Sequence, residues 1–377
     1  MRIALSTYAI AFLVASTVGV GFFGIPSSFA QSGTGIGLIF LILLGGLVLL
    51  TNLAYGEIVL RTHQRHQFVG YVRRYLGHGA RIVNQINFWI AAYGSLLGII
   101  IINGLFASSV LAYAGIHISN ITLGSAFMII AVVLVSYGLR TVSHVDFGVL
   151  CITITVIILI ALVGFPHIAR ENFVFVGNGN LFLPFGVILF SLNGLSGIPL
   201  VREVLIGKEE KYRRTILFGT MIPFAAYLVF SLVVVGVTGI HTSEEAVRGL
   251  SAVLGDWVTV AGSFFGFLTS ATIFLSVITA FKKTLQEDFQ FRRRRYFFIL
   301  LLPPLLLYWL GAHSFVKIIG LVGGVAVSID MILLLFVYAR AKDHGNRIPE
   351  YSLNIPNVVL YAMMFVFMLG AIYTLVM

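Results

Sequence analysis

Long apolar runs without charged residues are the feature that most limits how this chain can fold. Eleven such runs occur along its 377 residues, and each is near or above the roughly 17 residues that cross a bilayer as a helix. Only 10% of the residues are charged, against about a quarter in soluble domains. Because a helix satisfies its own backbone hydrogen bonds in lipid, we predict an all-α polytopic membrane protein with about eleven transmembrane helices.

The predicted spans follow the apolar runs. They cover residues 3–29, 35–60, 82–112, 121–138, 147–166, 182–201, 215–240, 257–281, 296–311, 318–339 and 357–377. The ninth is marginal because Pro303 and Pro304 split it. The first run is longer than the roughly 7 to 15 apolar residues of a signal peptide, which favours a retained span.

The distribution of positive charge predicts the topology. The net charge of +10 would suggest a nucleic-acid partner in a soluble protein. Here 21 of the 24 Lys and Arg residues fall in loops on one side, and only Arg170, Arg248 and Lys317 fall on the other. Basic residues in short loops stay in the cytoplasm. We therefore expect a cytoplasmic N-terminus, an external C-terminus and no nucleic-acid partner.

A motif that interrupts helices occurs twice. Residues 21–26 and 194–199 share G-x-x-G-I-P, and they lie 173 residues and five spans apart. An odd number of spans reverses the direction through the membrane. This pattern predicts two five-helix halves with inverted topology, residues 1–166 and 182–339, in which the first and sixth helices are discontinuous; residues 357–377 form an additional helix. The alternative is that these residues only permit kinks and close packing.

The two breaks are the predicted substrate site. Glycine and proline leave amides and carbonyls unpaired, and an unpaired group in hydrocarbon costs several kcal/mol unless a ligand meets it. Amides at the first break would bind a carboxylate, and carbonyls at the second would bind an ammonium. The predicted site comprises Gly19, Val20, Gly21, Phe22, Phe190, Ser191, Asn193 and Gly194.

Both breaks resemble the signatures of a known family. Residues 17–26 are similar to the T-x-G-A-G-x-x-x-x-P signature of the amino acid/auxin permease family, with Val20 where a small residue is usual. Residues 184–203 are similar to its second signature. The match points to the bacterial hydroxy and aromatic amino acid permease branch, within the amino acid-polyamine-organocation superfamily. It implies a LeuT-type fold, here with one extra C-terminal helix, and secondary transport of amino acids.

An acidic residue inside the tenth span is a candidate for ion coupling. Asp330 lies near the middle of that span, where a carboxylate is expensive to bury and is by default a functional candidate. Burial favours the neutral carboxyl, so Asp330 would take up and release a proton. A packing role is the alternative.

The resemblance also implies a sodium site as an alternative to proton coupling. Thr269 and Ser270 match the position where LeuT-type carriers place two hydroxyls opposite first-span carbonyls, here those of Ala15 and Val18, and hard cations prefer oxygen ligands. Hydrogen bonding between helices would equally explain both hydroxyls. In some proton-coupled relatives, the ammonium of a lysine in the fifth span takes the place of sodium. The fifth span of this chain has no lysine. Proton coupling would therefore depend on Asp330.

Other polar positions have weaker assignments. Tyr93 in the third span would close over the substrate, and Asn193 with Ser196 would contact its side chain, with packing as the alternative. Glu57 lies four residues before Arg61, where an ion pair or snorkelling to water explains it.

Two loops contain helix signals. Thr242 and Glu245 form a capping-box pattern, which predicts a short helix on the outside. Residues 68–76 show helical apolar spacing beside Arg73 and Arg74, which predicts a helix at the cytoplasmic surface. For both segments the alternative is an ordinary loop helix, without the role of an outer lid or a surface helix.

The leading interpretation is an amino acid symporter in the cell membrane that needs no cofactor. It would be driven by protons or, alternatively, by sodium, and would alternate access around a site at the bilayer midplane. A channel or a non-transporting amino acid sensor on the same helices is the alternative. The sequence lacks H-E-x-x-H, G-x-S-x-G and paired aspartates within its spans, which argues against an intramembrane enzyme.

Overall fold

The computed structural model describes residues 5–136, 143–287 and 293–376, and all regular secondary structure within these ranges is helical. Helices occupy all eleven predicted ranges in order. Arg2, Arg140 and Arg292, which belong to the predicted charge pattern, lie outside the described residues, as do residues 3, 4, 137, 138 and 377 of the predicted spans.

Eight of the predicted spans are single helices. They are α3 (Thr34–Arg61), α5 (His78–Tyr113), α6 (Asn120–Ser136), α7 (Ser143–Gly164), α10 (Tyr212–Thr238), α12 (Asp256–Glu287), α13 (Arg293–Trp309) and α16 (Asn357–Val376). Helix α12 continues six residues beyond the predicted end of its span at residue 281.

Three spans are composite. The first consists of α1 (Leu5–Thr17), a 3-10 turn (Gly21–Phe23) and α2 (Gly24–Ser32), and the sixth of α8 (Leu183–Ser191) and α9 (Gly197–Val204). The tenth consists of α14 (Phe315–Leu321), a π-helical segment (Val322–Val327) and α15 (Ser328–His344). The sequence predicted the two breaks but not the π-helical segment.

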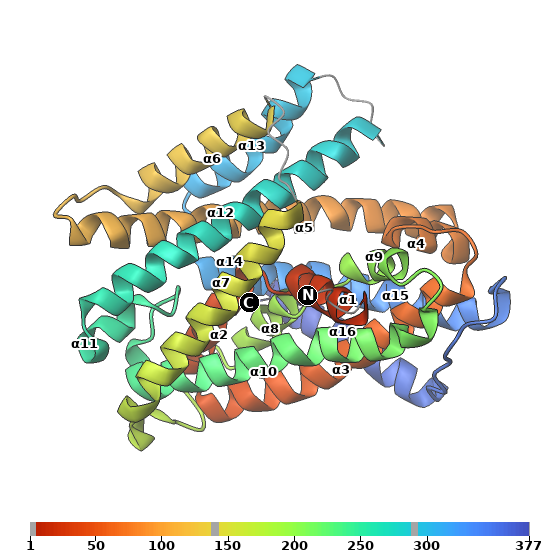
Figure 1. The fold of residues 1–377 in the computed structure, drawn as a ribbon, viewed down its shortest axis with the longest axis horizontal. Helices are drawn as coiled ribbons and strands as arrows, with labels where there is room; N and C mark the ends of the chain where they lie inside the picture. Colours follow the sequence, from red (N-terminus) through yellow and green to blue (C-terminus); the bar gives the residue numbers. More distant parts are fainter. Residues whose placement is uncertain (1–4, 137–142, 288–292, 377) are drawn as a thin grey trace.

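Length and hydropathy support a multi-pass membrane protein. Among the described residues, six helical segments are long and apolar enough to cross a membrane, and the bent α1–α2 pair adds a seventh. Shorter apolar helices occupy residues 120–135, 153–167 and 298–309. The long helices run roughly along the longest axis, with α4 (Phe68–Leu76) near one end and α11 (Ser251–Leu254) at the other (Figure 1). We call these the α4 end and the α11 end.

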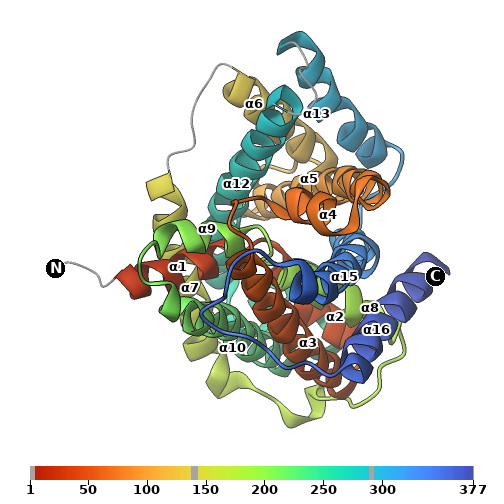
Figure 2. The same ribbon diagram turned by 90° about the vertical axis from the view of Figure 1, so that its right-hand side faces the viewer.

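The helices form two groups. Helices α5, α6, α12 and α13 pack mainly against one another, whereas the two broken spans pack with α3 and α10. Figure 2 shows the first group on one side of the molecule and the second on the other, with α15 and α16 alongside. The two breaks therefore belong to one group of helices and face the other.

The loop predictions had different outcomes. Helix α4 confirms the predicted helix over residues 68–76, with Tyr71, Val72 and Tyr75 buried. The capping box is wrong. The Thr242 hydroxyl donates to the Gly239 carbonyl at 2.7 Å, and no helix begins there because Ala246 adopts a positive φ of 66°.

Two acidic residues of this same loop have different partners, one within the loop and one in a neighbouring segment. Glu245 is buried and forms an ion pair with Arg248 at 3.2 Å. Burial raises the pKa of the Glu245 carboxyl above its usual value, and Arg248 opposes that shift. Glu244 accepts a hydrogen bond from the Ser314 hydroxyl at 2.7 Å, immediately before α14. The loop thus covers the α11 end and contacts the start of the tenth span.

Glu57 holds together the α4 end of the molecule. The predicted ion pair with Arg61 is present at 2.7 Å, but the carboxylate is fully buried rather than snorkelling to water. It also lies 3.3 Å from the Lys342 ammonium and accepts hydrogen bonds from the Ser352 hydroxyl and the Leu353 amide. Glu57 therefore joins α3, α15 and the segment that leads to α16.

Replacing Glu57 by alanine is expected to destabilise the protein by about 3–5 kcal/mol, because Arg61 and Lys342 then lose the buried carboxylate that compensates their charges. The matched control is Glu350→Gln, which removes the more exposed ion pair with Arg347 and should cost about 1 kcal/mol or less. Thermal unfolding of the purified variants measures both. Equal effects would contradict the role of Glu57.

Candidate functional site

The two helix breaks meet inside the molecule. The first span bends by 59° between α1 and the segment that starts at Gly21. After each break, a helix starts at the second glycine of the repeated motif, Gly24 for α2 and Gly197 for α9, and the motif proline lies in its first turn. Proline is tolerated there because the first amides of a helix have no partner within it.

The breaks pack against each other reciprocally. A Cβ atom added to Gly21 would lie 2.6 Å from the hydroxyl oxygen of Ser191, the last residue of α8. A Cβ added to Gly194 would lie 2.3 Å from the hydroxyl oxygen of Thr17, the last residue of α1. The first glycine of each motif thus contacts the end of the opposite half-helix, and both contacts require the absence of a side chain.

Unpaired backbone groups gather at this junction. Around the first break, the Val18 amide donates a hydrogen bond to the Val14 carbonyl, and the Phe23 amide donates one to the Val20 carbonyl. Within the described part of the chain, the amides of residues 19–22 donate to no carbonyl. The site around Gly19 is open, because no atom lies within 4 Å of a Cβ added there. An anionic group could therefore meet these amides.

Tyr227 connects the carbonyl ends of the two broken spans. Its hydroxyl, on α10, lies 3.4 Å from the Thr17 carbonyl oxygen and 3.3 Å from the Ser191 carbonyl oxygen. Both distances are long for a hydroxyl hydrogen bond, and one proton serves two acceptors. The C-terminal ends of α1 and α8 therefore keep acceptor capacity for a cationic group.

Aromatic rings surround the first break. The Phe22 ring stacks on Phe23 at 4.0 Å and on Tyr227 at 5.7 Å, and it meets Phe230 edge to face at 5.2 Å. The Phe23 ring meets Phe106 of α5 edge to face at 4.9 Å. These rings come from both helix groups, so a flat apolar ligand would find compatible surfaces here.

Asp330 forms a separate polar cluster with α5. One of its carboxylate oxygens accepts hydrogen bonds from the Asn84 and Asn87 side-chain amides at 3.0 and 2.8 Å. The Asn87 amide also donates to the Ala326 carbonyl of the π-helical segment at 2.8 Å. Two donors on one oxygen suit the ionised carboxylate. No local pattern in the sequence identifies either asparagine as a partner of Asp330.

The hydroxyls considered for sodium have other partners. The Ser270 hydroxyl lies 3.0 Å from the Asn103 side-chain oxygen and 2.7 Å from the Gly266 carbonyl, and the Thr269 hydroxyl lies 3.1 Å from that of Thr153 on α7. In the described residues, no hydrogen bond joins either hydroxyl to Ala15 or Val18. The sodium site stays a prediction.

The remaining predicted side chains lie at different distances from the junction. The Tyr93 hydroxyl donates to the Ile299 carbonyl of α13 at 3.2 Å, so it contacts α13 in this structure; Phe106, further along α5, reaches the break. Asn193 is half-buried and accepts from the Leu195 amide at 3.4 Å, while Ser196 is exposed. Phe190 and Ser191 border Gly21, as predicted for the site.

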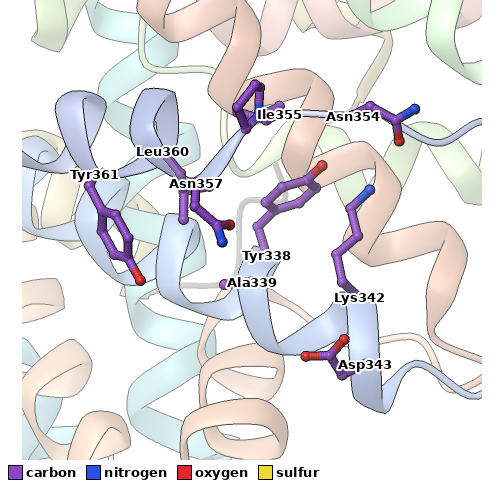
Figure 3. A pocket seen from close by; sticks show the side chains of 10 residues that line it. Tyr338, Ala339, Lys342, Asp343, Asn354, Ile355, Asn357, Leu360 and Tyr361 are labelled. Atoms are coloured by element: carbon purple, nitrogen blue, oxygen red, sulfur yellow. The ribbon is translucent and has the colours of Figure 1, made fainter.

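The larger described cavity lies elsewhere. It has a volume of about 670 Å³ and lies between the end of α15 and the start of α16, where Tyr338, Lys342 and Asn357 line it (Figure 3). None of its lining residues belongs to either break. The junction of the breaks is the better candidate for the substrate, because the unpaired amides and carbonyl ends lie there and not at this cavity.

Comparison with known proteins gives the family. A model of the tryptophan/tyrosine permease family matches residues 5–376. The chain belongs to this family. The resemblance to amino acid permeases is thereby confirmed at this level, while the amino acid/auxin and superfamily labels stay predictions.

Two curated proteins resemble this permease. The tyrosine-specific transport system 2 of Haemophilus influenzae is 29% identical over 262 residues, which are 65% of this chain and 61% of the relative. The match thus spans less than two thirds of that relative. The glutamine transporter 2 of Aliivibrio fischeri is 20% identical over 343 residues, 88% of each chain.

A solved structure confirms the LeuT-type fold of the permease. The crystal structure of MhsT in complex with L-phenylalanine superposes with a TM-score of 0.67 at 11% identity, covering 100% of this chain and 98% of that one. At such low identity the likeness concerns the fold alone.

Sequence reasoning missed Tyr227, Phe106 and Phe230 of the permease. Each is aromatic and lies in a span where many aromatic residues face lipid or pack in the core. Only the tertiary structure shows that these three lie at the breaks.

Tyr227→Phe is expected to leave the permease folded and to raise the KM for its substrate about tenfold. The phenyl ring keeps the stacking with Phe22, but the hydroxyl no longer holds the two carbonyl ends together, and one hydrogen bond contributes about 0.5–1.5 kcal/mol. Concentration-dependent uptake into proteoliposomes measures KM. The control is Tyr361→Phe, an exposed tyrosine on α16, and an unchanged KM in Tyr227→Phe would exclude this role.

Proposed function

We propose that this permease is a secondary transporter that moves amino acids across the membrane together with a coupling ion. The observation that carries the proposal is the junction of the two breaks. Unpaired amides at residues 19–22 suit a carboxylate, and the carbonyl ends at Thr17 and Ser191 suit an ammonium. An α-amino acid carries both groups on the same carbon atom.

The rings at the first break favour a substrate with an aromatic side chain. Phe22, Phe23, Phe106 and Phe230 supply edges and faces that pair well with another ring. One relative is named as a tyrosine-specific transport system, and the structural neighbour was solved with phenylalanine bound. Both names are consistent with an aromatic substrate. The relative named for glutamine makes that amino acid the first competitor to test.

We assign the coupling ion to the proton and its carrier to Asp330. The carboxylate lies inside the tenth span and accepts hydrogen bonds from two asparagine side-chain amides of α5. Proton uptake would remove the charge that holds both amides, so it would loosen the contact between α5 and the tenth span. Since α5 belongs to one helix group and the tenth span also packs with α3 and α8 of the other, this change would couple protonation to movement between the groups. Sodium at Ala15, Val18, Thr269 and Ser270 is the alternative.

The topology follows from the charge pattern. We place the α4 end in the cytoplasm, because the described basic segments around α4, after α9 and at the end of α15 lie there (Figure 1), and the α11 end outside. The outer half-helices α2 and α8 are largely buried, and so is most of the inner half-helix α9, with Ser196 immediately before it exposed.

Uptake of labelled amino acids into proteoliposomes tests the function. We expect accumulation of tyrosine, phenylalanine or tryptophan under an imposed inward pH gradient, with saturation kinetics. Accumulation under a sodium gradient alone would show that sodium, and not the proton, is the coupling ion. Conduction without saturation would indicate a channel, binding without flux would indicate a sensor, and uptake of none of the twenty amino acids under either gradient would refute the proposal.

A further inference from the structure

A second, smaller cavity lies at the α4 end of the molecule. It has a volume of about 130 Å³ and is bordered by α3, by the segment before α4, by α4 itself and by the half-helix α9. Its polar lining consists of Arg65, His66, Tyr71, Arg202 and Glu203, together with Gln67. None of these residues belongs to the junction of the breaks or to the Asp330 cluster.

A buried hydroxyl beside this cavity lacks a well-formed hydrogen bond. Tyr71 is fully buried, yet its hydroxyl has no well-formed hydrogen bond within the described residues, although the backbone of His66 lies near it. Burying a hydroxyl without a partner is unfavourable. A ligand in the cavity that accepts this hydrogen bond would offset that cost.

Arg202 offers further donors. It is 7% exposed, and one of its terminal nitrogens donates to the Val59 and Thr62 carbonyls at 2.6 and 2.8 Å, at the end of α3. Within the described part of the chain, the other guanidinium N–H groups make no hydrogen bond. A planar guanidinium with free N–H groups suits a carboxylate.

The charges in the cavity have both signs. Arg65 and Arg202 are cationic, Glu203 is anionic, and burial and Arg74 lower the pKa of the His66 ring, which favours its neutral form. Arg65 and Arg202 would attract an anionic group, and Glu203 would attract a cationic one. A ligand with a carboxylate and an ammonium would complement both kinds of residue.

We propose that this cavity is a second amino acid site, distinct from the transport site, which binds the carboxylate and ammonium of a cytoplasmic amino acid. Arg65, Arg202 and the Tyr71 hydroxyl bind the carboxylate, and Glu203 binds the ammonium. The volume corresponds to about four water molecules at about 30 Å³ each, so only the head group enters. Recognition is therefore independent of the amino acid side chain.

The site regulates transport through α9. Arg202 already joins this half-helix to the end of α3, and a ligand shared with Arg65 and Tyr71 adds a bond to the segment around α4. Bound amino acid thus holds α9 in the arrangement seen here and slows its movement. This regulation rests on the proposed transport function, whereas the binding site does not.

Binding of L-alanine to the purified full-length protein tests the site. Wild type is expected to bind L-alanine, and Tyr71→Phe and Arg65→Gln each weaken that binding about tenfold. The matched control is Tyr55→Phe, which also removes a buried, unpartnered hydroxyl but does not border the cavity. Acetate and ethylamine, each with one of the two charges, are expected to bind at least tenfold more weakly than alanine.

Two results would overturn the site. Alanine binding that is equal in Tyr71→Phe, Arg65→Gln and Tyr55→Phe would remove these residues from it. Acetate binding as tight as alanine binding, with no effect of Glu203→Gln, would make the cavity a plain anion site.

Preloaded proteoliposomes test the regulation. Internal L-alanine is expected to slow uptake of labelled tyrosine severalfold in wild type and in Tyr55→Phe but not in Tyr71→Phe. Acceleration by internal alanine would indicate exchange through the transport site and would overturn the regulatory role. If wild type takes up no amino acid at all, the proposed function fails, while the alanine-binding experiment still decides whether the second site exists.

Discussion

Replacing Gly21 by alanine is expected to reduce amino acid uptake about a hundredfold or more. The new methyl carbon would lie 2.6 Å from the Ser191 hydroxyl oxygen, 2.8 Å from the Phe190 ring and 3.0 Å from the Ser191 Cα. The first two contacts involve side chains, but the third is with backbone, so α8 and the first break must separate. A misplacement of about 1 Å can cost about a hundredfold in rate when a site depends on positioned groups. Initial uptake rates in proteoliposomes measure the loss.

Two glycine variants serve as controls for Gly21→Ala. Gly46→Ala on α3 adds the same methyl group where no atom lies within 4 Å, so uptake should be unchanged. Gly19→Ala also meets no atom within 4 Å, but its methyl group enters the open space at the first break. We expect Gly19→Ala to fold normally and to raise KM. Normal uptake by Gly21→Ala would show that the close contact of the two breaks is not needed for transport.

Replacing Asp330 by asparagine is expected to abolish accumulation driven by a pH gradient while exchange of amino acids continues. The substituted amide is neutral like the protonated carboxyl, so its oxygen holds Asn84 and Asn87 only as weakly as that form does, but it can neither take up nor release a proton. One unit of pH difference supplies about 1.4 kcal/mol, which allows about tenfold accumulation. In Asp330→Asn, the ratio of internal to external amino acid should fall to one. Accumulation ratios measured at imposed pH gradients give the answer.

The matched control for Asp330→Asn lies on the same helix. Asp343 is exposed at the end of α15, and Asp343→Asn should accumulate amino acids as wild type does. An Asp330→Asn variant that retains full pH-driven accumulation would remove this carboxylate from the coupling mechanism and leave the sodium alternative to be tested.

Local chemistry determined much of the fold. Apolar runs without charges can form only helices in lipid, so the number, order and approximate limits of the spans follow from the sequence. The repeated G-x-x-G-I-P motif located both breaks to within a few residues, because few other residues leave helical hydrogen bonds open. The spacing over residues 68–76 likewise predicted α4. The Thr242–Glu245 pattern failed because a capping box is a weak local preference: Glu244 instead contacts Ser314, and Glu245 instead pairs with Arg248.

Only the tertiary structure decided which side chains meet. Tyr227, Phe106 and Phe230 reach the breaks through the packing of α5 and α10, and the Asn84 and Asn87 amides reach Asp330 across 246 and 243 residues of sequence. It also showed Glu57 as the centre of a buried network rather than half of a simple helix pair. The physical reason is that hydropathy and helix breaking depend on neighbouring residues. Contacts between helices depend on their rotation and crossing, which the apolar runs here leave open because their hydrophobic residues surround the whole helix.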